Sequence, residues 1–407
     1  MDNPDRKRVP VLRSLLLVSL VSLFVPLAST GAAAAACPTQ FVTSPLPPAA
    51  ADEGLVSAST GGASSAWAVG VAFSRHDPVP LHWNGSSWSG EPIPRVRHTF
   101  SSLIGVAASS DTDVWATGAV TSRVSAASGA SPAFSPVKIF QPRRPSLSSQ
   151  PLALHWDGSA WTSAAVPLPS GGKNAMLERS SALSSTDVWS VGAVHLRSRR
   201  GRTSNLIEHW GGTAWSVIPS PNVGVHEDQL IGVDAVSASE AWAVGTRGRR
   251  IGDHALIEHW NGVSWSAVPS GLHHAYLLDV SASGPTDAWA VGVKTSRNSD
   301  GPVMLHWDGA AWSRVGLPAE TVGGVLEGVS VVAPDDVYAV GSTFNPTSGG
   351  ETSLILHWDG SSWTSKSAES VGDDQLVGVT AGASGVWAVG ATFDFTSESG
   401  LIETPCG

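Results

Sequence analysis

Apolar and polar side chains alternate over short stretches along most of the 407-residue chain, and turn-forming residues separate these stretches. Residues 256–260 and 265–269 flank Asn261 and Gly262, a pair that favours the positive φ angles of a tight hairpin turn. The alternation predicts two short β-strands joined at this pair. The same hairpin pattern recurs around Trp83, Trp156, Trp210, Trp307 and Trp358.

A second pattern, W-A-V-G, precedes each hairpin. It begins at Trp242 and recurs at Trp67, Trp115, Trp189, Trp289 and Trp387, with Tyr338 in place of Trp once. These markers follow one another at roughly fifty residues, apart from one longer interval after Trp115, and such a period is typical of propeller blades. Within one repeat the pattern predicts strands a, b, c and d over 230–236, 241–245, 256–260 and 265–269. We therefore expect an all-β fold, a seven-bladed β-propeller of four-stranded antiparallel blades.

The two ends of the chain carry an incomplete repeat. Residues 401–404 match the start of a strand c, and the sequence stops soon afterwards. Residues 37–45 resemble a strand d, so we expect the N-terminal strand to close the last blade. Cys37 and Cys406 would then be bridged by a disulfide, which suits an exported protein, and lipidation of Cys37 is the alternative.

The chain divides into three kinds of segment. Residues 1–36 combine a basic start, an apolar run and small residues before Cys37, which predicts a signal peptide, with an uncleaved anchor as the alternative. Residues 37–407 form a single predicted propeller domain. Within it, residues 121–150 are rich in Pro, Ser and Ala and read as a low-complexity loop insertion. The protein is expected to be secreted or extracellular, and associated with the cell envelope if Cys37 is lipidated.

Composition narrows the function classes. The formal net charge of -10 disfavours nucleic acid as a partner, and no later segment resembles a membrane span. All 18 Trp fall in the tetrads and hairpins, which predicts packing between blades rather than sugar stacking. One strand position carries a histidine in six repeats, which predicts structural histidines: His82, His155, His209, His259, His306 and His357. No cofactor or metal is expected, and the chain is expected to be a monomer.

Candidate chemistry lies where the repeats differ. The segments between strand d and the next strand a are expected to be loops that bear Arg95, Arg97 and His98; Lys173, Glu178 and Arg179; His226, Glu227 and Asp228; His273, His274 and Tyr276; Glu320; Asp373 and Asp374. Imidazoles and carboxylates from two adjacent loops suit a divalent metal or a general acid and base, although a solvated polar surface is the favoured explanation. The weak catalytic candidates are His226, Glu227, His273 and Tyr276. The sequence contains no recognised nucleophile motif.

Arginines gather in two consecutive segments between strands b and c, at Arg197, Arg199, Arg200 and Arg202 and at Arg247, Arg249 and Arg250. In an acidic protein such a local excess suits an acidic polysaccharide, and a solvated loop is the alternative. The candidate ligand-binding residues are Arg95, Arg97, His98, Arg197, Arg199, Arg247, Arg249 and His274.

The W-A-V-G and H-W-D-G-x-x-W repeats resemble those of exported actinobacterial proteins, and the resemblance implies a seven-bladed propeller. The turn is also similar to the Asp-box of sialidase-type propellers, with Asp157, Asp308 and Asp359 at the Asp position and Asn84, Asn261 and Gly211 replacing it. We expect a binding or interaction protein that recognises a glycan or a protein through its variable loop face. An enzyme, either a polysaccharide lyase or a glycoside hydrolase acting in a pocket of that face, and a purely structural envelope protein are the alternatives.

Overall fold

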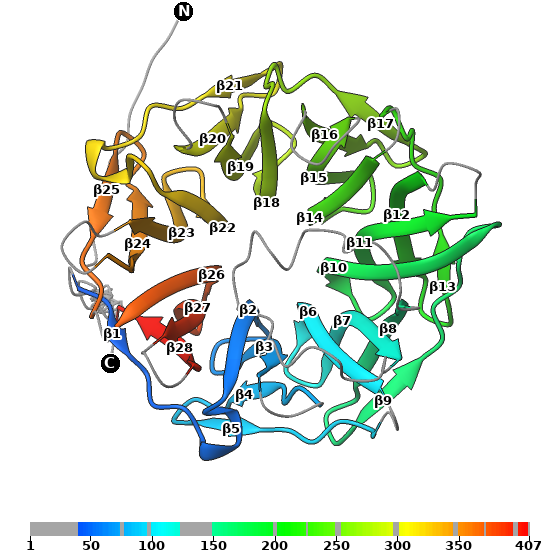
Figure 1. The fold of residues 1–407 in the computed structure, drawn as a ribbon, viewed down its shortest axis with the longest axis horizontal. Coiled ribbons are helices and arrows are strands. Elements are labelled where there is room, and N and C mark those ends of the chain that lie inside the picture. Colours follow the sequence, from blue (N-terminus) through cyan, green and yellow to red (C-terminus); the bar gives the residue numbers. More distant parts are fainter. Residues whose placement is uncertain are drawn as a thin grey trace, which may run out of the picture. The chain divides into compact units, whose positions relative to one another are not determined.

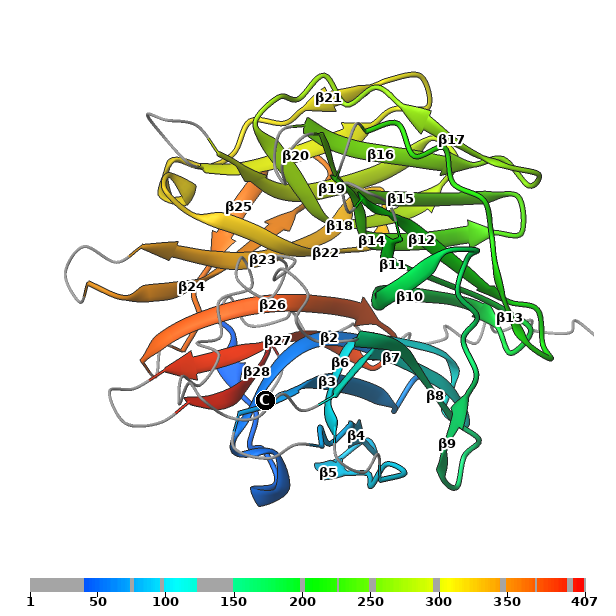
Figure 2. The same cartoon turned by 45° about the vertical axis from the view of Figure 1, so that its right-hand side comes forward.

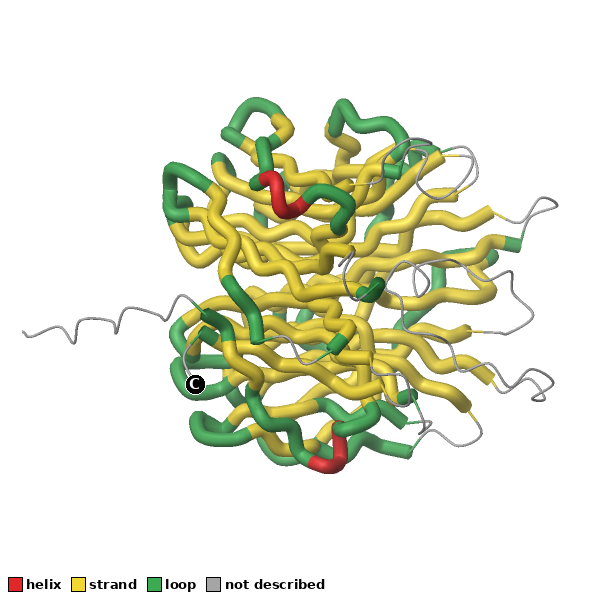
Figure 3. Tube along the Cα trace, turned by 60° about the vertical axis from the view of Figure 1, so that its left-hand side comes forward, coloured by secondary structure: helices red, strands yellow, loops and turns green. Residues whose placement is uncertain are grey.

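Most residues of the computed structural model lie in short antiparallel strands (Figure 3), and helix is confined to two 3-10 turns, η1 (Pro48–Ala50) and η2 (Ala319–Thr321). The structure describes residues 40–73, 77–95, 99–122, 149–197, 202–224, 227–248, 254–295, 301–344, 349–369, 372–393 and 398–405. The predicted signal peptide, Cys37, Cys406 and most of the predicted insertion at 121–150 lie outside these ranges. Within the ranges, no helix is long and apolar enough to cross a membrane.

The strands follow the predicted order a, b, c, d in each repeat. The first two sheets contain β2 (Glu53–Thr60), β3 (Ala66–Ala72), β4 (Leu81–Trp83) and β5 (Trp88–Gly90), then β6 (Thr99–Ser110), β7 (Asp113–Ser122), β8 (Ser149–Trp156) and β9 (Trp161–Ala164). The next two groups contain β10 (Gly172–Ser184), β11 (Asp187–Leu196), β12 (Arg202–Trp210) and β13 (Trp215–Val217), then β14 (Glu227–Ser237), β15 (Glu240–Gly248), β16 (His254–Trp260) and β17 (Trp265–Val268). A single parallel bridge between Thr203 and Glu227 joins these two groups into one sheet.

The remaining sheets repeat the pattern. They contain β18 (Ala275–Gly284), β19 (Asp287–Lys294), β20 (Gly301–Trp307) and β21 (Trp312–Arg314), then β22 (Val325–Ala333), β23 (Asp336–Phe344), β24 (Glu351–Trp358) and β25 (Trp363–Lys366). In the last sheet, β26 (Asp373–Gly382) and β27 (Gly385–Phe393) precede β28 (Glu398–Thr404), and β28 pairs with β1 (Val42–Thr43) through Val42–Thr404 and Thr43–Glu403. The predicted all-β fold of four-stranded antiparallel sheets is confirmed.

All of these strands belong to one compact unit, Pro38–Gly407. In Figure 1 the a strands β2, β6, β10, β14, β18, β22 and β26 lie nearest the centre, and neighbouring a strands contact one another, β2 with β26 included. Figure 2 shows β5, β13, β17 and β21 at the periphery. The hydrophobic core therefore lies between the sheets, in clusters that each combine residues of two neighbouring sheets.

A β-bulge in each a strand explains the glycine of the tetrad. In β14 the register shifts between Leu230 and Gly232, so that Ile231 is an extra residue opposite β15. The bulge brings the carbonyl of Gln229 against Gly245, where an added Cβ would lie 2.0 Å from the oxygen. Every tetrad therefore ends on glycine, because a side chain would collide with backbone.

The hairpin turns use the Asn or Asp side chain differently from our prediction. Gly262 has φ of 87°, but Asn261 does not adopt a positive φ. Instead its Oδ1 accepts the N–H groups of Val263 and Ser264 at 3.0 Å. The prediction of a hairpin is confirmed, but the expected positive φ at Asn261 is wrong, because the side-chain cap holds the turn with positive φ at glycine alone.

Tryptophans join each sheet to the next. The ring of Trp67 lies 5.2 Å from Trp156 and 5.4 Å from Trp161 of the following sheet, measured between ring centroids. The same arrangement links Trp115, Trp189, Trp242 and Trp289 to the hairpin of the sheet that follows each, and Trp387 of the last sheet to Trp83 and Trp88 of the first. All the tetrad rings are buried, as a role in packing requires. Indole hydrogen bonds to backbone carbonyls occur at the hairpin residues Trp210, Trp260, Trp307 and Trp358.

Tyr338 has a different partner from the tryptophans that it replaces. The sheet that follows it has no hairpin between strands c and d. The N-terminal segment supplies Phe41 instead, whose ring centroid lies 6.5 Å from that of Tyr338 in an edge-on arrangement. Phe41 is 2% exposed and packs in the same cluster as Tyr338, Ile355 and Leu376. Its backbone also bonds to Ser367 and Glu369 of the chain segment after β25.

We expect Phe41→Ala to lower the free energy of unfolding by about 3–5 kcal/mol, because it empties a buried aromatic site. Urea unfolding followed by tryptophan fluorescence measures the change. Phe344→Ala is the matched control, because Phe344 is 60% exposed and its loss should change the free energy of unfolding by less than about 0.5 kcal/mol. Equal stability of the two variants would show that the N-terminal segment does not anchor the last sheet.

Candidate functional site

The predicted catalytic candidates lie in separate surroundings. Tyr276 is buried in an apolar cluster with Ile231 and Leu278. His273 is exposed, and its Nδ1 lies 2.9 Å from Nδ1 of His254 on the neighbouring sheet. Glu227 begins β14, where its backbone pairs with Thr203 and Gly248, and His226 lies outside the described residues. His273 thus contacts His254, and the backbone of Glu227 is held in the sheet.

The predicted ligand-binding residues fall into three groups. Arg95, Arg197 and His274 are exposed, and His274 adopts a φ of 52°. Arg247 is half-buried on β15, between Asp228 on β14 and His254 on β16. The others lie outside the described ranges: Arg97, His98, Arg199 and Arg249.

Several residues expected in loops lie within strands. Lys173, Glu178 and Arg179 belong to β10, Glu227 and Asp228 to β14, Tyr276 to β18, and Asp373 and Asp374 to β26. The expectation was wrong because the a strands begin earlier than predicted, paired with b strands that also extend further than predicted. Asp228 shows the consequence, since it is fully buried and accepts the N–H of Gly224 at 2.8 Å, with Arg202 3.9 Å away.

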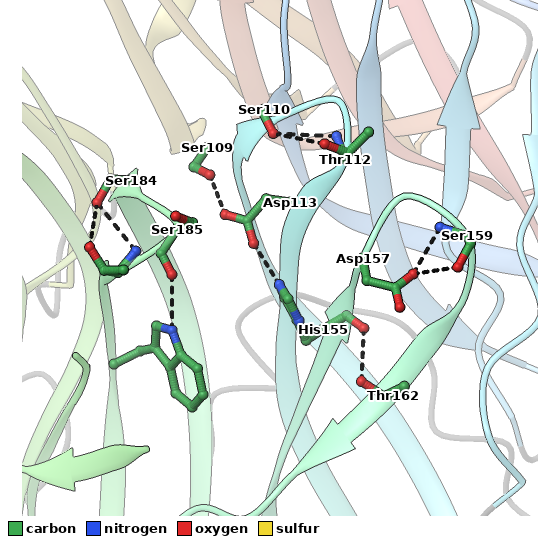
Figure 4. A network of polar contacts seen from close by, with 12 residues as sticks. Ser109, Ser110, Thr112, Asp113, His155, Asp157, Ser159, Thr162, Ser184 and Ser185 are labelled. Atoms are coloured by element: carbon green, nitrogen blue, oxygen red, sulfur yellow. Dashed lines mark hydrogen bonds and ion pairs between the residues drawn. The ribbon is translucent and has the colours of Figure 1, made fainter. Parts of the chain in front are cut away.

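The repeated histidines are part of the scaffold. His155 lies flat against Trp115, and its Nε2 lies 2.5 Å from Oδ1 of Asp113, as Figure 4 shows. Equivalent bonds at 2.7 to 2.9 Å join His209 to Asp187, His259 to Glu240, His306 to Asp287 and His357 to Asp336. His82 differs, because its Nε2 lies 3.3 Å from the hydroxyl of Ser65. These imidazoles orient the tetrad rings, so they are occupied by structural contacts.

Arg179 connects four of the innermost strands. From the bulge of β10, its guanidinium donates to the carbonyls of Val377 on β26 at 2.9 Å and of Glu327 on β22 at 3.4 Å. Its Nε lies 3.6 Å from Oδ1 of Asp279 on β18, and both side chains are nearly buried. We call Glu178, Arg179, Asp279 and Glu327 the central polar group.

Two carboxyl groups of the central polar group stand at bulge positions where other repeats have apolar residues. Glu178 and Glu327 correspond to Val56, Ile104 and Val377. Burial raises the pKa of Glu178 to about 8, although Gln229 donates to it at 3.1 Å. Burial and the negative charge of Glu351 raise the pKa of Glu327 well above its usual range. A raised pKa favours the protonated form of each carboxyl group, and in that form the group can donate a hydrogen bond.

Three further glutamates replace leucine in the c strands. Glu208, Glu258 and Glu403 are fully buried, and the equivalent residues are Leu81, Leu154, Leu305 and Leu356. Glu258 accepts hydrogen bonds from Asn205 at 2.8 Å and from Ser220 at 2.9 Å, while burial raises its pKa to about 7. Glu208 has no partner for either carboxyl oxygen in the described part of the chain, and burial raises its pKa to about 8. Burial also raises the pKa of Glu403 to about 8, and the charges of Asp374 and Glu369 add to this.

The central polar group and the buried glutamates of the c strands have structural roles. Among the described residues, no group of three or more His, Cys, Asp or Glu side chains is arranged to hold a metal ion. The sequence did contain a signal for the central polar group. The two residues after the first leucine of strand a include charged residues in two repeats, E-R at 178–179 and L-D at 278–279. The corresponding residues in two other repeats are I-G at 104–105 and V-G at 377–378. Comparing the a strands position by position would have found them.

Comparisons with known proteins support the fold and leave the family open. No protein-family model matches the chain, and no curated protein matches it. The structure of YCF48 bound to a D1 peptide is similar over 89% of this chain and 94% of that one, with 13% identity and a TM-score of 0.54. A sialidase of Trypanosoma rangeli matches 87% of this chain and 54% of its own, with 11% identity and a TM-score of 0.47. A six-bladed propeller, the fucose-recognising lectin of Aleuria aurantia, matches 77% of this chain and 96% of its own, with 11% identity and a TM-score of 0.45. The fold is of the β-propeller type.

We expect Glu208→Leu to stabilise the protein and Glu258→Leu to destabilise it. Leucine at 208 removes unpartnered polar atoms and should raise the free energy of unfolding by about 1–3 kcal/mol at pH 5. Leucine at 258 leaves Asn205 and Ser220 without their partner, and should lower the free energy of unfolding by a similar amount. Urea unfolding of both variants measures the two changes.

The stability difference between Glu208→Leu and the natural protein should also depend on pH. Because the folded pKa of Glu208 lies above its unfolded value, the folded state binds more protons between about pH 4.5 and pH 8, and stability falls as pH rises through that window. Glu208→Leu should flatten this fall, so its advantage over the natural protein should be larger at pH 8 than at pH 5. An advantage that does not grow with pH would contradict a buried, protonated Glu208.

Proposed function

We propose that this protein is an exported seven-bladed propeller that binds another macromolecule, a protein or a glycan, through the face at which the a strands begin. The single observation that carries the proposal is that the polar residues of the described strands make contacts inside the fold. The histidines orient tryptophans, Arg179 ties inner strands together, and the carboxyl groups of Glu178, Glu208 and Glu258 are buried. The ionisable groups of this scaffold therefore serve structural contacts, whereas its exposed residues differ between repeats. Such a scaffold suits binding.

Three observations support seven blades closed by the N-terminal strand. The tetrads number seven in the sequence, the a strands contact one another in order with β26 beside β2, and β1 pairs with β28. Trp387 also packs on Trp83 and Trp88 of the first sheet. A closed arrangement couples the first sheet to the last, and it leaves only the short outer strands as sheet edges.

Enzymatic cleavage of a polysaccharide is the second candidate function. It draws on His273, exposed beside His254 at the end of a strand, where an imidazole pair can exchange protons with a ligand. The binding proposal has the better support, since Tyr276 packs in an apolar cluster and the YCF48 structure provides an example of a similar fold with a bound peptide.

The two functions can be separated by measuring binding and turnover on the same sample. The secreted protein should bind members of a glycan array or a peptide library without releasing reducing ends or unsaturated products from a panel of polysaccharides. His273→Ala should leave binding within about twofold, because the proposal gives that side chain no special role. Turnover that is abolished by His273→Ala would refute the binding proposal and establish the enzyme.

We also propose that Cys37 and Cys406 are joined by a disulfide after removal of residues 1–36. The support is the pairing of Val42 with Thr404, since Cys37 lies five residues before Val42 in the sequence and Cys406 lies two residues after Thr404. Peptide mapping of the secreted protein under non-reducing conditions should yield one peptide that links the two cysteines and a mature chain that begins at Cys37. A mature chain with a lipid on Cys37 would instead place the protein on the cell envelope and exclude the bridge.

A further inference from the structure

Phenylalanine side chains gather at one end of the innermost strands. Phe73 directly follows β3, Phe100 lies at the start of β6, and Phe393 ends β27. All three pack against one cluster of buried residues, which consists of Val56, Val71, Ile104, Val377 and Ala391. Each remains partly exposed, so the rings form the outer layer of this cluster.

Phe344 extends the same end of the molecule on the adjoining sheet. It ends β23, is 60% exposed, and pairs across the ladder with Glu351, the first residue of β24. Gln375 of β26 donates to Glu351 at 2.5 Å, which ties this ladder to the sheet that contains Phe393. We call Phe73, Phe100, Phe344 and Phe393 the phenylalanine surface.

Carboxylates border the phenylalanine surface. Phe344 pairs with Glu351, and Phe393 pairs with both Asp373 and Glu398. These three acidic residues are partly exposed. The backbone N–H of Phe73 donates to the carbonyl of Asp52, which is a further acidic residue at this end.

Basic residues are distributed differently. Within the described parts of the three sheets formed by β22–β25, β26–β28 with β1, and β2–β5, the strands bear one Lys or Arg, Lys366, and it lies on β25 at the periphery. The corresponding ends of the β10–β21 strands carry several: Lys173, Arg197, Arg202, Arg247 and Lys294. Among the described residues, the border of the phenylalanine surface is therefore acidic at Phe344 and Phe393, exposed Arg95 precedes Phe100, and the other half of the same face is rich in basic residues.

We propose that the phenylalanine surface binds an extended protein segment in which an aromatic or aliphatic side chain stands next to Lys or Arg. The inference rests on the binding function proposed above and names the partner. An apolar side chain gains free energy by covering the exposed rings, and the cation beside it can pair with Asp373 or Glu398. A cation can also lie over a phenylalanine ring. Neutral and acidic glycans lack this combination of an apolar side chain and a positive charge.

The experiment is a selection of random dodecapeptides displayed on phage against the secreted full-length protein. The enriched peptides should share an apolar residue beside Lys or Arg. Synthetic copies should bind the natural protein, and Phe344→Ser should weaken their binding about tenfold or more, as expected for a central apolar contact. Val263→Ser is the matched control, because Val263 is 83% exposed on the β16–β17 turn at the opposite end of the strands. It should leave the affinity unchanged.

A charge variant tests the negative border. Asp373→Asn should weaken binding several-fold and reduce the dependence of the affinity on salt, because one ionic contact is removed. Fluorescence anisotropy of the labelled peptides at low and high salt measures both effects.

Three outcomes overturn this inference. Enriched peptides may bind Phe344→Ser as well as the natural protein, they may be acidic and depend on Arg247 instead, or no peptide may be enriched. A glycan-array signal in any of these cases would leave the proposed binding function standing. The absence of both peptide and glycan binding would refute the two proposals together.

Discussion

The structure depends on one contact that six of the seven tetrads make, the packing of the tetrad tryptophan against the two hairpin tryptophans of the next sheet, while Tyr338 packs on Phe41 instead. The ring needs a fixed orientation to fit between them, and the strand c histidine provides it by lying against the ring at 4.2 to 4.6 Å. A carboxylate two residues before the tetrad aromatic, such as Asp113 before Trp115, then holds the histidine. The motif residues are therefore one physical unit, in which each side chain positions the next.

This packing allows unusual groups to be buried between and inside the sheets. Glu208 and Glu403 occupy leucine positions, and Arg179 crosses between strands that lie far apart in the sequence. A buried charge is costly unless it is paired or neutralised, and both solutions occur here. Arg179 has Asp279 and two carbonyls as partners, whereas Glu208 keeps its proton. The scaffold thus tolerates polar residues through rigidity supplied by the aromatic contacts.

Repetition made the fold predictable, and departures from repetition made the site difficult to predict. The alternating pattern around Trp260 and the tetrad at Trp242 repeat often enough to place every strand type, and the even spacing of histidines indicates a structural role. Glu178 and Arg179 were expected in the loop before strand a, whereas they stand at the bulge within β10, which depends on the neighbouring strand. Phe344 and Phe393 each stand six residues after the tetrad aromatic, as Phe73 does, but only the ladder brings Phe344 and Phe393 beside acidic residues.

The pairing of Phe41 with Tyr338 has a consequence for how the chain is made. Phe41 is among the first residues of the described unit to be synthesised, and its partners on β23, β24, β26 and β28 are among the last. During synthesis the early sheets can form in turn, but the last one must wait until β28 has emerged. Until then the apolar segment around Phe41 stays uncovered, which exposes the nascent protein to aggregation and gives chaperones a site to hold. Completion of the last sheet is thereby coupled to the synthesis of its last strands.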